Sequence, residues 1–289
     1  MRALRLVLLL ALAAGCAKEL TPRSVLFDLR VLAIRATPLE VGPTDAVTLD
    51  AVRLPPPGAT IVEEHWTFCP FSVGSSAAYA CAVPACETEL VPTGTPSDHV
   101  SAPVTASPGA LALACVTLLS GSGALPPDVP RQLPEKIDTI FRYVVRASDG
   151  SAREAVQRLP LYPGGAPADR NVPPVIASVE LGGSQVDPYV GPDPTLAPGV
   201  ELDVVVTLTP ESAQTYVEGG RTLTEQLVVS FYTTAGRFDY DWANGPVASV
   251  KLKGDSLVAG TTEAQVWVVA RDLRGGEAVG GPYRVAVAP

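Results

Sequence analysis

The sequence predicts an all-β protein: two tandem antiparallel β-sandwiches that follow a cleaved signal peptide. Three observations support this prediction. Short apolar runs alternate with polar residues at a period of two, which is the pattern of half-buried strands. The chain has 25 Gly and 29 Pro among 289 residues, as expected where many turns join short strands. Its two halves also resemble each other.

The internal similarity begins with a matching pair of strands. The run 47–52 follows a Gly-Pro pair with apolar residues at every second position, and the run 202–208 follows a Pro-Gly pair in the same way. Aligning Pro43 with Pro198 brings the two runs into register without a gap. Each half therefore predicts one sandwich.

Each half also ends in a predicted hairpin. A strand over 141–147 turns at 148–151, and a strand over 266–270 turns at 272–276. Asp and Gly suit such turns because they accept positive φ. The run Val-Val-Ala-Arg-Asp-Leu-Arg-Gly-Gly at 268–276 resembles the last hairpin of bacterial immunoglobulin-like and PKD-like sandwich domains. This resemblance implies two immunoglobulin-like sandwiches.

The modules are expected at residues 25–163 and 174–289. A linker rich in Pro and Gly joins them at 164–173, and its prolines predict a stiff spacer. Within the first module, residues 69–136 form a long predicted insertion with one further strand at 111–119. Long excursions without a core of their own are often stapled or functional.

Four of the five cysteines lie inside this insertion: Cys69, Cys81, Cys86 and Cys115. An even number of cysteines in an exported chain predicts two disulfides. The sequence leaves all three pairings open. A four-thiolate zinc site is the alternative, but such sites usually bring their ligands in closely spaced pairs.

The N-terminus is typical of an exported bacterial protein. Two arginines precede the apolar run 6–14, which is shorter than the roughly 20 residues that a membrane span requires. Residues 12–16, Leu-Ala-Ala-Gly-Cys, resemble a lipobox, although Ala13 occupies the position that most often holds Leu.

The lipobox resemblance implies that signal peptide 1–15 is removed and that Cys16 is lipidated, with the lipid bilayer as partner. Residues 16–24 then form a tether that is expected to hold the first module close to the membrane. Ala17 follows the cysteine, and the absence of Asp there implies sorting to the outer membrane, on its periplasmic or surface-facing side. Ordinary signal-peptidase cleavage, which releases a soluble protein, is the alternative.

Charge and motifs exclude several functional classes. The chain carries 21 Lys+Arg against 30 Asp+Glu, which argues against binding of nucleic acid or of lipid through a polybasic patch. We find no nucleophile elbow, zinc-protease motif or phosphate-binding loop, and we predict no catalytic residue, metal or cofactor. Carboxylate-only catalysis stays open.

The two histidines are weak candidates for a site. Glu63, Glu64 and His65 are adjacent, but successive strand residues point to opposite faces, so the three cannot converge on one metal. We expect an exposed strand here with Trp66 on its buried face. His99 lies in a loop rich in Ser and Pro and is expected to be solvated.

The run 238–242 is the one candidate ligand contact. Phe238, Tyr240 and Trp242 alternate with two aspartates, so the run is interpreted first as a strand with its aromatic rings inside. The same three rings could instead stack on sugars while the carboxylates bind hydroxyl groups. A calcium site that uses the aspartates is a third interpretation.

These observations predict a membrane-anchored cell-envelope lipoprotein that acts as a non-catalytic binding or structural module. Its partner would be an envelope protein or polysaccharide. The alternative is a carbohydrate-recognising surface lipoprotein that uses residues 238–242, and an enzyme of unknown class comes third.

Overall fold

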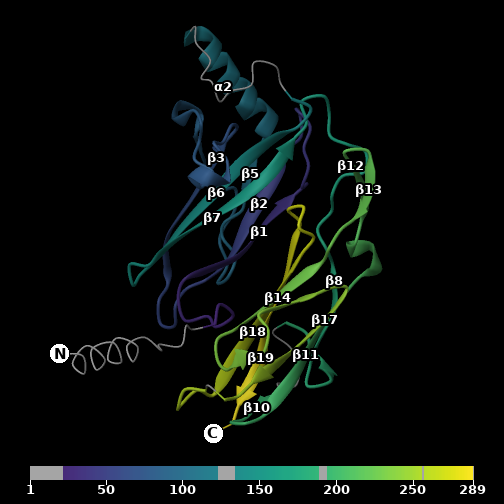
Figure 1. The fold of residues 1–289 in the computed structure, drawn as a ribbon. Helices are drawn as coiled ribbons and strands as arrows, with labels where there is room; N and C mark the ends of the chain where they lie inside the picture. Colours follow the sequence, from purple (N-terminus) through teal and green to yellow (C-terminus); the bar gives the residue numbers. More distant parts are fainter. Residues whose placement is uncertain (1–21, 123–133, 189–193, 256, 289) are drawn as a thin grey trace, which may run out of the picture.

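The computed structural model describes residues 22–122, 134–188, 194–255 and 257–288, and it confirms the all-β prediction. Two sandwiches follow each other along the chain, and each encloses its own buried core (Figure 1). The predicted signal peptide and Cys16 lie outside the described residues.

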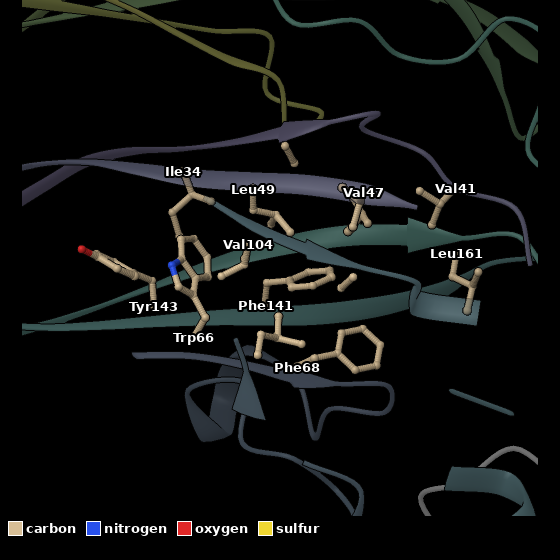
Figure 2. Close-up of a cluster of buried hydrophobic side chains, with 14 of the residues drawn as sticks. Ile34, Val41, Val47, Leu49, Trp66, Phe68, Val104, Phe141, Tyr143 and Leu161 are labelled. Carbon is tan, nitrogen blue, oxygen red and sulfur yellow. The ribbon is translucent and has the colours of Figure 1, made fainter. Parts of the chain in front are cut away.

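Module 1 is a sandwich of two antiparallel sheets. Its strands are β1 (Arg30–Thr37), β2 (Val47–Leu54), β3 (Ile61–Cys69), β4 (Thr88–Leu90), β5 (Val104–Ala106), β6 (Ile137–Ala147) and β7 (Ala152–Leu161). One sheet has the order β1-β2-β5 and the other β4-β3-β6-β7. Figure 2 shows Trp66, Phe68 and Phe141 on one side of the core, opposite Ile34 and Leu49.

Module 2 repeats this plan. Its strands are β8 (Ile176–Leu181), β9 (Ser184–Gln185), β10 (Thr195–Leu196), β11 (Glu201–Leu208), β14 (Val228–Thr233), β15 (Arg237–Phe238), β16 (Trp242–Asn244), β17 (Val247–Lys253), β18 (Glu263–Arg271) and β19 (Glu277–Val287). The sheets have the orders β15-β17-β11-β8-β9 and β10-β19-β18-β14-β16. A separate hairpin joins β12 (Thr215–Glu218) to β13 (Arg221–Thr224).

The two modules match strand by strand. The set β1, β2 and β5 corresponds to β8, β11 and β17, and the set β3, β6 and β7 corresponds to β14, β18 and β19. In both modules a short segment pairs in parallel with the last strand: Val41 with Leu161, and β10 with β19. This is the immunoglobulin-like arrangement that the resemblance of the 268–276 hairpin implies.

Residues 108–122 differ from the prediction. The expected strand at 111–119 is wrong, because the chain forms helix α2 (Pro108–Ser122). Leu and Ala are good helix formers, and Pro is favoured at a first helical position. The buried side of α2 shows the helical spacing of three and four residues: Ala112, Cys115 and Leu119.

The predicted insertion 69–136 belongs partly to the sandwich. Its segments β4 and β5 pair with β3 and β2, so they extend both sheets. The prediction of two disulfides is confirmed, and the pairs are Cys69 with Cys81 and Cys86 with Cys115. The second disulfide connects α2 to the short helical turn η2 (Pro84–Cys86).

The modules pack directly against each other. An apolar cluster forms between the outer face of the β1-β2 pair and the outer face of β18. Its central members are Leu32 and Val52 from module 1 and Trp267 and Val269 from module 2. Strand β18 is therefore buried on both faces, because Val266 and its alternate neighbours fill the core of module 2.

A polar network completes the junction. The Arg274 guanidinium lies 2.8 Å from a carboxylate oxygen of Glu225 and 3.3 Å from one of Glu40. Burial raises the pKa of Glu225 above its ordinary value. Asn171, from the predicted linker, donates its backbone N–H to Glu40 (2.8 Å) and its side-chain amide to Asp272 (3.0 Å). The expected spacer is thus part of a packed junction.

Candidate functional site

The segment before β1 pairs with module 2. Val25 forms a parallel bridge with Thr233 at the end of β14. Leu26 donates its N–H to the Thr233 carbonyl, and Thr233 donates its N–H to the Ser24 carbonyl, both at 2.8 Å. The side chain of Leu26 is buried in the junction. The residues next to the predicted tether are thus fixed on module 2, whereas we expected them to hold module 1 close to the membrane.

The edge of β14 explains this contact. Strand β16 covers that edge only along Val228–Ser230, and the Phe231 N–H bonds the Asp241 carbonyl just beyond. Thr233 is left with an uncovered edge, which Val25 fills. An unpaired strand edge readily accepts another extended segment.

The three aromatic candidates at 238–242 have different environments. Phe238 is 4% exposed and packs against Phe231, with the ring centroids 5.6 Å apart, so it is not available to a ligand at the surface. Tyr240 and Trp242 are 70% and 56% exposed, so the preferred interpretation of one strand with all three rings inside is wrong. The chain here passes from β15 in one sheet to β16 in the other, which breaks the alternation.

Both aspartates of this turn have partners within the chain. Asp239 accepts the backbone N–H groups of Tyr240 (2.9 Å) and Lys251 (2.8 Å). Asp241 accepts the hydroxyl of Ser24 at 2.5 Å. The aspartates therefore shape the turn and attach it to the N-terminal segment. We call residues 238–242 the aromatic turn.

The aromatic turn carries an exposed tryptophan, whereas the other two tryptophans are buried. Trp66 and Trp267 are each 2% exposed, in the core of module 1 and in the junction. Trp242 is therefore the exposed member of the three tryptophans in the chain.

A cleft of about 390 Å³ opens beside the junction. Its lining includes Arg35, His99 and Trp267, and the last two rings meet edge to face with centroids 4.9 Å apart. Burial lowers the pKa of His99 below its ordinary value. The expectation of a solvated His99 is wrong, because the loop that carries it folds over β18 of the other module.

Trp267 was not among the sequence candidates. The unbroken apolar run Val266–Ala270 could have identified it, because a strand with apolar residues on both faces is usually covered on both sides. Among the described residues, the ring N–H of Trp267 and the Nδ1 atom of His99 have no hydrogen-bond partner.

The expected exposed strand with Trp66 on its buried face is present as β3. Glu63 bonds His65 on the exposed face of β3, with 2.7 Å between the Glu63 Oε1 and His65 Nε2 atoms. Glu64 points the other way, where it pairs with the buried guanidinium of Arg53 and accepts the Tyr143 hydroxyl at 2.5 Å. The described ranges contain no cluster of three His, Cys, Asp or Glu side chains that could hold a metal ion.

No protein-family model and no curated protein sequence matches this chain. Similar solved structures include the D00-D0 domain of intimin (13% identity, covering 89% of this chain and 100% of that one, TM-score 0.25). They also include fibronectin(III)-like modules of Clostridium thermocellum CbhA (11%, 90% and 92%, 0.26) and the Ig1-2 module of the Drosophila receptor tyrosine phosphatase DLAR (9%, 91% and 100%, 0.27). The fold assignment rests on the strand pairing itself.

Proposed function

We propose that this chain is a lipid-anchored protein of the bacterial cell envelope. The observation that carries the proposal is the lipobox-like run that ends at Cys16. Acyl chains on this cysteine would bury many methylene groups at about 0.8 kcal/mol each, and more than one chain makes such an anchor stable. The two disulfides support an oxidising compartment outside the cytoplasm.

We further propose that the two modules act as a non-catalytic binding or structural unit. In the described ranges, neither histidine hydrogen-bonds a serine, threonine or cysteine side chain, a contact that hydrolases use to activate a nucleophile. No helix in those ranges has the length and apolar character of a membrane span.

Exchange of the lipidation site tests the anchor. A Cys16→Ala variant should move from the detergent phase to the aqueous phase in detergent partitioning, whereas a Ser24→Ala variant keeps the cysteine and should stay in the detergent phase. Unchanged partitioning of the Cys16→Ala variant would refute the lipid assignment.

Placement in the outer membrane has its own test. Because Asp directly after the modified cysteine favours retention in the inner membrane of Gram-negative bacteria, an Ala17→Asp variant should shift from outer-membrane to inner-membrane fractions on a density gradient. Equal distribution of both forms would argue against sorting by this position.

The carbohydrate-binding alternative uses the same aromatic turn. Tyr240 and Trp242 are exposed, as stacking on sugars requires. However, the Oδ1 atoms of Asp239 and Asp241 already accept hydrogen bonds within the chain, so part of each carboxylate that was expected to bind sugar hydroxyl groups is engaged. The structure thus supports this alternative less well than the sequence does.

A further inference from the structure

We infer that the aromatic turn of module 2 is a membrane-contacting surface, in which Tyr240 and Trp242 lie in the headgroup region of the bilayer that holds the lipid anchor. This inference rests on the proposed lipidation of Cys16. The partner of the two exposed rings is then a phospholipid surface.

The predicted tether leaves the folded chain next to the aromatic turn. Asp241 lies between the two exposed aromatic residues and accepts the Ser24 hydroxyl. The backbone bonds between Ser24, Leu26 and Thr233 fix the direction of the segment. The N-terminal segment therefore emerges beside the aromatic turn.

The stretch of chain between Cys16 and the first described residue is short. Five residues separate Cys16 from Pro22, where the described structure begins, so the chain takes six Cα-to-Cα steps between them. A fully extended chain spans at most about 3.5 Å per residue, so Pro22 stays within about 20 Å of the acylated cysteine. That reach is less than the thickness of a bilayer's hydrocarbon core, about 30 Å. An anchored molecule must therefore keep the neighbourhood of Ser24 close to the lipid surface.

The exposed side chains here are aromatic. Trp and Tyr combine an apolar ring with a polar group, and they concentrate at membrane interfaces for this reason. Phe27, on the N-terminal segment itself, adds a ring that is 51% exposed. The Oδ1 atom of Asp239 and the Oδ1 atom of Asp241 accept hydrogen bonds within the chain.

The arrangement also sets which part of the molecule faces away from the membrane. Figure 1 shows α2 at the end of module 1 that lies far from the N-terminal segment. The junction holds module 1 on module 2 through Trp267 and the Arg274 network. The disulfide-linked region of module 1 is thus presented to the aqueous side.

The fluorescence of Trp242 can test this contact. The lipidated protein is reconstituted into phosphatidylethanolamine and phosphatidylglycerol vesicles, with and without brominated phosphatidylcholine, which quenches tryptophan on contact. Because Trp66 and Trp267 are buried, they provide an insensitive background. We expect brominated lipid to cause a loss of wild-type emission, and no loss in a Trp242→Phe variant. Equal wild-type emission in both kinds of vesicle would overturn the inference.

A longer tether provides the matched control. Twelve Gly and Ser residues inserted between Lys18 and Glu19 add about 20 Å of mean reach, so the aromatic turn is no longer held at the surface. This variant should float with vesicles as the wild type does and lose part of the quenching. Quenching equal to that of the wild type would contradict the role of the short tether.

Vesicle flotation separates the two proposals. If the wild-type protein fails to float, the proposed lipid anchor fails. If it floats without quenching of Trp242, the anchor stands and the membrane-contacting surface fails. If instead soluble polysaccharide released from lipopolysaccharide changes Trp242 emission and brominated vesicles do not, the aromatic turn binds carbohydrate and the inference is wrong.

Discussion

Module 1 and module 2 share one arrangement of strands but are stabilised differently. Module 1 contains long connections between its strands, and both disulfides lie there. Module 2 contains no cysteine, and its strands are joined mainly by short turns. The difference indicates that disulfides occur where a long connection buries few apolar side chains. The sandwich that the two modules share needs no disulfide.

The equivalent strands β6 and β18 show a second difference. The outer face of β6 includes exposed or half-buried residues, whereas β18 is buried on both faces because module 1 covers it. The two modules therefore use different outer faces for the junction: module 1 uses its β1-β2 pair and module 2 uses β18.

The largest effect is expected from the junction. A Trp267→Ala variant removes a fully buried ring and should lower the free energy of unfolding by about 4 kcal/mol. Urea unfolding followed by circular dichroism measures this change. Trp242→Ala, at an exposed position, is the control and should stay within about 0.5 kcal/mol of the wild type. Similar midpoints for both variants would show that the junction does not stabilise the chain.

Removal of one disulfide should distinguish the modules. Replacing both Cys86 and Cys115 by Ser releases a link between residues 29 apart, which is expected to cost about 3 kcal/mol. Hydrogen exchange should speed up in β3, β4 and α2 and remain unchanged in β11 and β17. Equal acceleration in both modules would contradict the view that the disulfides serve module 1.

The polar network of the junction should contribute less to the free energy of unfolding than its apolar cluster does. An Arg274→Leu variant leaves Glu40 and Glu225 without their cation and should cost about 2 kcal/mol. Arg237→Leu is the control, because the Arg237 pair with Asp255 is exposed and its loss should cost at most about 1 kcal/mol. Thermal unfolding compares the two, and equal losses would argue against a special role for Arg274.

The smallest effect concerns pH. Burial lowers the pKa of His99 from its ordinary value of 6.5, so the unfolded chain binds a proton more readily than the folded chain. The stability from neutral His99 is present above pH 6.5 and is lost as the pH falls through the lowered pKa. A His99→Gln variant should lose less stability than the wild type between pH 7.5 and pH 5. An identical pH dependence in the two proteins would contradict this.

The sequence predicted the parts of the fold that depend on local periodicity. Alternating apolar residues in β2 and β11 identified the core faces, and Asp and Gly identified the last hairpin of each module. The same reasoning failed for α2, because a run of Leu and Ala is apolar on every side and has no clear period. Its helical form follows from propensity and from Pro108.

Contacts between segments that are distant along the chain could not be predicted from local sequence patterns. His99 was expected in water because its loop is polar, yet it packs on Trp267, which lies 168 residues further along the chain. The N-terminal segment was assigned to module 1 because it precedes module 1, but its backbone bonds are with Thr233. The exposed rings were recognised as a group, although Phe238 belongs to the core because the chain changes sheets there.

The most direct test of the lipid anchor is the mass of the N-terminal peptide from the native protein. Proteolysis of membrane-extracted protein, followed by mass spectrometry, should give a peptide that begins at Cys16 and carries the mass of a diacylglycerol and an amide-linked acyl chain. A peptide that begins at Met1, or one that begins at an unmodified Cys16, would contradict both the anchor and the membrane contact that depends on it.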